Sequence, residues 1–121
     1  MSENTLTKLN KEEGMQVLEL VTFKAKAGVS KEQVLEVNER VMEQVKGFSG
    51  FLYRSLCWQQ GSESWLDIVY WQDQASVDAA QEKFMASAIC QQLMEIIDVE
   101  STKMQHADIL LSSCTESETC G

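Results

Sequence analysis

The sequence contains no proline, a single histidine and few basic side chains for its acidic content. Its 121 residues include 10 Lys and Arg against 19 Asp and Glu, which gives a formal net charge of −9. Nucleic-acid-binding proteins need clustered basic residues that displace counterions from phosphates, so this charge argues against nucleic acid and against anionic membranes as partners. The chain also lacks a bilayer-spanning apolar run and a basic-then-apolar leader, so we expect a cytoplasmic protein.

The cysteines are few and lack the spacing of a metal site. They form no CxxC pair, so no metal site is predicted. Cys57 and Cys90 fall inside predicted elements and are expected to be buried thiols. Cys114 and Cys120 lie in a polar tail, where a disulfide, or a metal clip with His106, is an alternative that a reducing cytosol disfavours.

One globular stretch lies between two polar ends. Apolar residues make up 44% of the chain, and its length is sufficient for one domain with a hydrophobic core. Residues 1–14 are polar and expected to be flexible, residues 15–110 form the domain, and residues 111–121 form a polar tail.

Hydrophobic periodicity within residues 15–110 alternates between strands and helices. Residues 15–26 are rich in strand formers and largely apolar on both faces, which is typical of a central strand covered on both sides. Ser30 and Gln33 form a capping box that begins a helix ending near Lys46. This helix has a buried stripe of Val34, Val37, Val41 and Val45. The remaining expected elements are strands at 50–59, 64–71 and 100–110, and a helical stretch at 76–97 that bends near Ala86 and Ser87.

The second and third strands are expected to form a hairpin whose loop is centred on Gly61 and Ser62. The resulting cross-strand pairs are Trp58 with Trp65, Leu56 with Asp67, and Arg54 with Val69. This register places Arg54 diagonal to Asp67 on one face of the sheet, within side-chain reach. A slip of one residue would separate them, so the ion pair depends on the register.

The order β-α-β-β-α-β is that of the ferredoxin-like unit, an α+β fold with an antiparallel four-stranded sheet. The stretches LELVTFKAKAGVSKEQV, VKGFSGFLYRSL, WLDIVYWQDQASVDAAQEKF and KMQHADIL resemble the antibiotic-biosynthesis monooxygenase-like (ABM-like) family of dimeric α+β barrels. The resemblance covers about residues 15–110. It implies a homodimer in which two sheets pack face to face, with the helices outside. A second copy would cover the apolar sheet face that the helices leave open.

The resemblance also implies an activity. Cofactor-independent oxygenases of this family bind a phenolic or quinol-like polyketide between sheet and helices, and promote its deprotonation and its reaction with O₂. The resemblance implies that this chain acts on a small aromatic compound of the phenol or quinol type. Haem-degrading relatives place an asparagine on the first strand and a tryptophan and a histidine on the second helix. Residues 15–26 contain no Asn, and residues 76–97 contain no Trp or His, so no haem or other cofactor is expected. The alternative is a non-catalytic homodimer that binds small molecules or serves in assembly.

The candidate catalytic residues are His106, Asp67 and Arg54. Histidine is the residue type most often used as a general base near neutral pH, so His106 is a candidate for this role, although an exposed structural histidine is the alternative. Asp67 and Arg54 can orient a phenolate or a carboxylate, and the alternative for them is a structural ion pair.

The candidate substrate-binding residues are Trp71, Tyr70, Tyr53, Trp58 and Asn38. Tryptophans can wall an aromatic pocket and tyrosines can donate to an oxyanion, while core or barrel-face packing is the alternative for both. Asn38 lies beside the helix stripe and can face the cleft. Glu19 lies among apolar neighbours, so it is either paired across a dimer or kept neutral as an acid.

Overall fold

Four antiparallel strands form one sheet in the computed structural model, which describes residues 15–113. The elements are β1 (Val17–Ala25), α2 (Lys31–Val45), β2 (Phe51–Gln59), β3 (Ser64–Trp71), α3 (Gln74–Met85), α4 (Ala88–Ile96) and β4 (Ile97–Asp108). The strand order is β2-β3-β1-β4, so β1 and β3 are central and β2 and β4 form the edges. The predicted α+β order and the central position of the first strand are confirmed. Residues 1–14 and 114–121, with Cys114 and Cys120, lie outside the described residues.

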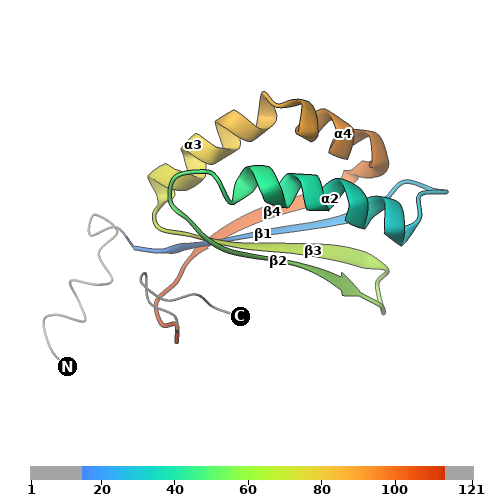
Figure 1. Cartoon of the computed structure of the whole chain (residues 1–121). Helices are drawn as coiled ribbons and strands as arrows, with labels where there is room; N and C mark the ends of the chain where they lie inside the picture. The colour runs from blue at the N-terminus through green and yellow to red at the C-terminus, as the bar shows by residue number, and fades with distance from the viewer. Residues whose placement is uncertain (1–14, 114–121) are drawn as a thin grey trace, which may run out of the picture.

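The helices lie together on one side of the sheet (Figure 1). Helix α2 begins as predicted, because the Ser30 Oγ accepts from the Gln33 amide at 3.1 Å and the Gln33 Oε1 accepts from the Ser30 amide at 2.8 Å. Its valine stripe is buried against the sheet: Val34, Val37, Val41 and Val45. Among the helices of residues 15–113, none is both long and apolar enough to cross a membrane.

The expected break in the second helical stretch is confirmed at Ala86 and Ser87, which separate α3 from α4. Ser87 has an extended backbone and caps α4, its Oγ accepting from the Cys90 amide at 3.2 Å. The same hydroxyl donates to the Phe84 carbonyl at 2.7 Å. One serine therefore ends the first segment and begins the second, and the two helices present different faces to the sheet.

Strand β4 begins earlier than the sequence predicts. Ile97 was assigned to the helix, but its φ of −103° and ψ of 152° are extended, and it pairs with Ala25 of β1. Its side chain is buried with Phe23 and Trp65, a position that it reaches from the strand. The register between β1 and β4 shifts between Thr22 and Lys24, so the edge strand is irregular close to its start.

The face of the sheet opposite the helices is half-buried and mostly apolar. We call it the far face, and it carries Leu18, Leu20, Thr22, Tyr53, Leu66, Ile68 and Tyr70. Nothing within residues 15–113 packs over it to bury these side chains fully. Cys57 was expected to be buried, but it is exposed, because it lies on the edge strand β2 on this uncovered face. Cys90 is buried, as predicted.

Candidate functional site

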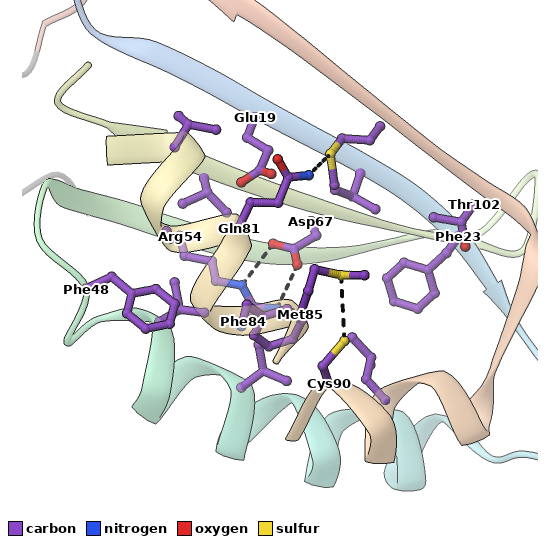
Figure 2. A pocket seen from close by; sticks show the side chains of 18 of the residues that line it. Glu19, Phe23, Phe48, Arg54, Asp67, Gln81, Phe84, Met85, Cys90 and Thr102 are labelled. Atoms are coloured by element: carbon purple, nitrogen blue, oxygen red, sulfur yellow. Dashed lines mark hydrogen bonds and ion pairs between the residues drawn. The ribbon is translucent and has the colours of Figure 1, made fainter. Parts of the chain in front are cut away.

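A cavity of about 170 Å³ lies between the helix-covered face of the sheet and the three helices. Its walls are mostly apolar, and its lining residues come from the helices as well as from the central strands. Figure 2 shows the Glu19 carboxylate and the Gln81 amide pointing into the same space as the Asp67–Arg54 pair. The polar lining residues are Glu19, Arg54, Asp67, Gln81 and Thr102. A small apolar cavity with a few convergent polar groups is typical of a ligand site.

The hairpin register that the sequence predicts is confirmed, with Arg54 opposite Val69 and Leu56 opposite Asp67. Arg54 reaches diagonally to Asp67 and binds it through two parallel hydrogen bonds. The Arg54 Nε donates to one carboxylate oxygen at 2.9 Å, and a terminal nitrogen donates to the other at 2.8 Å. Such two-point pairing fixes both side chains and neutralises the carboxylate.

Asn38 of α2 completes the surroundings of Arg54. Its Oδ1 accepts from the Arg54 guanidinium at 2.8 Å, while its own amide nitrogen donates to the Val34 carbonyl at 2.9 Å. Only 1% of the Arg54 side chain is exposed, against 18% for Asp67. The Arg54 guanidinium binds both Asp67 on β3 and Asn38 on α2. Arg54 therefore links its own strand, β2, to both of these elements.

Glu19 of β1 is the second carboxylate of the cavity. Its Oε1 accepts from the Trp71 indole nitrogen at 3.0 Å, and its Oε2 lies 3.6 Å from the His106 Nε2. The three residues come from neighbouring strands, because β1 pairs with β3 on one side and with β4 on the other. Among the described residues, Glu19 forms no ion pair with a lysine or arginine. Both of these contacts of Glu19, with Trp71 and with His106, lie within one protomer.

The predicted site residues do not all lie in the cavity. Trp71, Asp67 and Arg54 line the cavity, and His106 lies behind Glu19 on the edge strand. The two tyrosines contact each other edge-on across the far face, with ring centroids 5.8 Å apart. They are Tyr53 and Tyr70, and they do not line this cavity.

The remaining two predicted residues face other hollows. Trp58 packs edge-on against Trp65 near the start of α2, with the Lys31 ammonium 4.2 Å from its ring centroid. Asn38 borders an open groove beside α2 in addition to holding Arg54. Neither side chain lines the cavity, so a ligand there would meet Trp71 alone of the three tryptophans.

Sulfur-bearing residues of α3, α4 and β4 line part of the cavity, a feature that the sequence analysis missed. Met85, Met94 and Met104 line it together with Cys90. The Gln81 amide nitrogen lies 3.1 Å from the Met104 sulfur, and the Cys90 Sγ lies 3.9 Å from the Met85 sulfur. Burial raises the pKa of the Cys90 thiol, so it is held in its unreactive protonated form, as expected from its surroundings.

Within residues 15–113, no group of three or more His, Cys, Asp and Glu side chains lies close enough together to hold an ion.

Known structures share this fold. SnoaB, a cofactor-independent oxygenase from Streptomyces nogalater, matches with a TM-score of 0.63 over 86% of this chain and 99% of its own, at 15% identity. A protein of unknown function from Nitrosomonas europaea matches with a TM-score of 0.65 over 84% and 96%, at 13% identity. A possible oxidoreductase from Bacteroides thetaiotaomicron gives 0.62 over 79% and 99%, at 11% identity.

These likenesses confirm the ferredoxin-like α+β fold and the antiparallel four-stranded sheet that the sequence predicts. The structural relatives include an oxygenase, in agreement with the family that the sequence resembles. At these identities the likeness establishes the fold alone. No family profile matches the sequence. No curated protein matches it either.

Proposed function

We propose that this protein is a cofactor-independent monooxygenase of a small phenol or quinol-like compound, which binds in the cavity between sheet and helices. The observation that carries the proposal is this apolar cavity with two carboxylates in its wall, Glu19 and Asp67. SnoaB, which shares the fold, is a cofactor-independent oxygenase. Fold likeness does not transfer an activity, so the argument rests on what the cavity accepts.

The volume of the cavity favours a single aromatic ring. A dry cavity of about 150 Å³ is known to hold benzene, whereas drug-sized ligands occupy roughly 300 Å³ or more. The cavity here measures about 170 Å³. A monocyclic phenol matches this space, and a polycyclic one would require the helices to move apart. Trp71 and Phe84 supply aromatic surface for such a ring.

The chemistry requires a base and O₂. Removing the phenolic proton gives a phenolate, whose electron-rich ring reacts with O₂. In a phenol, one oxygen atom becomes a carbonyl on the ring carbon opposite the hydroxyl. In a quinol, where that carbon already bears oxygen, it becomes a hydroxyl on a neighbouring ring carbon of the quinone. The other oxygen atom leaves as water with the two hydrogens that the substrate loses. The substrate supplies all the electrons that O₂ takes up, so the balanced products are a quinone and water.

We propose further that the functional unit is a homodimer. The far face presents a row of half-buried apolar side chains, with Leu20 directly opposite Ile68 near its centre. A surface of this kind is rarely left in contact with water, and a second copy of the same face is complementary to it. The dimer would also close the side of the sheet that faces away from the cavity.

Oxygen uptake tests the proposed function. Purified, metal-stripped protein is given a panel of monocyclic phenols, dihydroquinones and anthrones, and O₂ consumption is recorded with and without chelator. We expect uptake well above the uncatalysed rate for single-ring substrates, retained in chelator. Uptake with anthrones alone would contradict the proposed size class. Binding of phenols without any uptake would favour the non-catalytic binding module.

A matched pair of variants controls for autoxidation of the substrates. Ala80 is buried in the cavity wall, and its neighbour Ala79 is exposed on the same helix. Ala80→Leu should fill the cavity and abolish uptake. Ala79→Leu adds the same side chain to the solvent side and should leave the rate unchanged. Equal activity of both variants would show that the reaction occurs elsewhere.

A further inference from the structure

We infer that Glu19 is the catalytic base of this cavity and that His106 carries the proton from Glu19 to solvent. The inference rests on the proposed function, which requires a base but does not identify one. The sequence analysis gave the role of general base to His106, and the role of orienting the substrate to Asp67 and Arg54. The geometry of the two carboxylates points to Glu19 instead.

The two carboxylates differ in what they are bound to. Asp67 is held at two points by Arg54, so its charge is neutralised and a proton would have to displace a guanidinium. Glu19 accepts a hydrogen bond from a neutral indole, that of Trp71, at 3.0 Å. A carboxylate offers about four lone-pair sites, so Glu19 keeps room for a substrate hydroxyl.

Trp71 fixes the orientation of Glu19. The indole is 3% exposed and packs edge-on against Phe51, with ring centroids 5.9 Å apart. Its N–H therefore holds one carboxylate oxygen in place without competing for a proton, because an indole is a donor only. Trp71 acts in this scheme as a positioning residue.

His106 connects the carboxylate to water. Its side chain is 31% exposed, that of Glu19 is 13% exposed, and the two lie directly opposite each other on β4 and β1. The 3.6 Å between Glu19 Oε2 and His106 Nε2 is slightly longer than a hydrogen bond, which is common for catalytic pairs before substrate binds. The relay requires His106, which stands on the edge strand β4, to approach Glu19 when the substrate binds.

The proton balance is complete. The substrate O–H bond breaks, its electron pair stays on the phenolate oxygen, and the proton goes to Glu19. The protonated, neutral Glu19 passes it to the His106 imidazole, and the imidazolium releases it to bulk water. One proton returns from water when the second oxygen atom of O₂ leaves as water, so the overall reaction releases no net proton. The groups that face Glu19 across the cavity are the neutral Gln81 amide and the Arg54–Asp67 pair, so His106 is the nearby acceptor that opens to solvent.

The test measures kcat, KM and ligand affinity in parallel. Glu19→Gln should reduce kcat by about 100-fold or more, the usual contribution of a general base, while a calorimetric titration with the phenol shows retained binding. Glu19→Asp keeps the carboxylate and should recover part of the loss. Glu82→Gln, on the exposed side of α3, removes the same charge and should leave kcat unchanged.

A separate measurement tests the proton relay through His106. His106→Ala should lower kcat at low buffer concentration, and added imidazole should restore it, which a structural role would not produce. If Glu19→Gln binds phenol and keeps the full kcat, this inference is wrong and the proposed function still stands. Wild-type protein that binds phenol without consuming O₂ would overturn the proposed function and the relay together.

Discussion

Arg54 illustrates how one buried charge is accommodated in this small domain. Its guanidinium is satisfied by Asp67 on the neighbouring strand and by Asn38 on α2. A buried ion pair adds little net stability, but removing one partner leaves an uncompensated charge. The pair was predictable from sequence, because a short hairpin loop fixes the register of the two strands that it joins.

Replacing one partner of this pair should be costly. Asp67→Asn leaves the Arg54 charge buried without its counter-ion, and we expect the free energy of unfolding to fall by about 3 kcal/mol. Urea denaturation measures this change. The double variant Arg54→Met with Asp67→Leu should lose less than the single one, since no charge is then stranded.

An exposed ion pair provides the control. Glu43 and Lys46 lie 3.0 Å apart on α2 with most of both side chains in water, so Glu43→Gln should leave the urea midpoint almost unchanged. Equal, small losses for Asp67→Asn and Glu43→Gln would mean that Arg54 is solvated in solution, contrary to the structure.

Local sequence signals predict which helices and strands form more accurately than they predict where each of them begins and ends. The capping box before α2 and the serine between α3 and α4 are short-range features, and the structure confirms both. The start of β4 was misplaced at position 100, because Ile97 continues the apolar spacing of a helix and its role in the core depends on distant residues. The Glu19–His106 contact was missed for the same reason, since it needs the register between β1 and β4.

The far face of the sheet carries a prediction at the scale of this element. Ile68→Asp places a charge at the centre of the proposed interface, and a two-fold axis would bring in a second copy of that charge. Light scattering after gel filtration should give the mass of two chains for the wild type and of one chain for the variant. Gln91→Asp, on the exposed side of α4, should remain dimeric. A wild-type protein with the mass of one chain would exclude the dimer.

At the scale of the whole molecule, the packing of the helices on the sheet forms a cavity from residues that are far apart in the sequence. The ferredoxin-like order could be predicted from hydrophobic periodicity, and four short stretches resemble an oxygenase family. The cavity could not, because its volume depends on how two helices diverge at Ser87 and on which side chains then meet the sheet. The positions of Glu19 and of the methionines in the cavity wall depend on that packing. The two tyrosines that were predicted to bind the substrate lie instead on the far face.

Binding of a single-ring phenol inside the cavity is the central claim, and the methionines provide a direct view of it. Met85, Met94 and Met104 line the cavity, whereas Met42 borders the groove beside α2. A titration of ¹³C-methyl-methionine-labelled protein with phenol, followed by NMR, should give saturable shifts for the three cavity methyls and none for Met42. Ala80→Leu should abolish those shifts. Shifts at Met42 with silent cavity methyls, or no shifts at saturating phenol, would contradict the account.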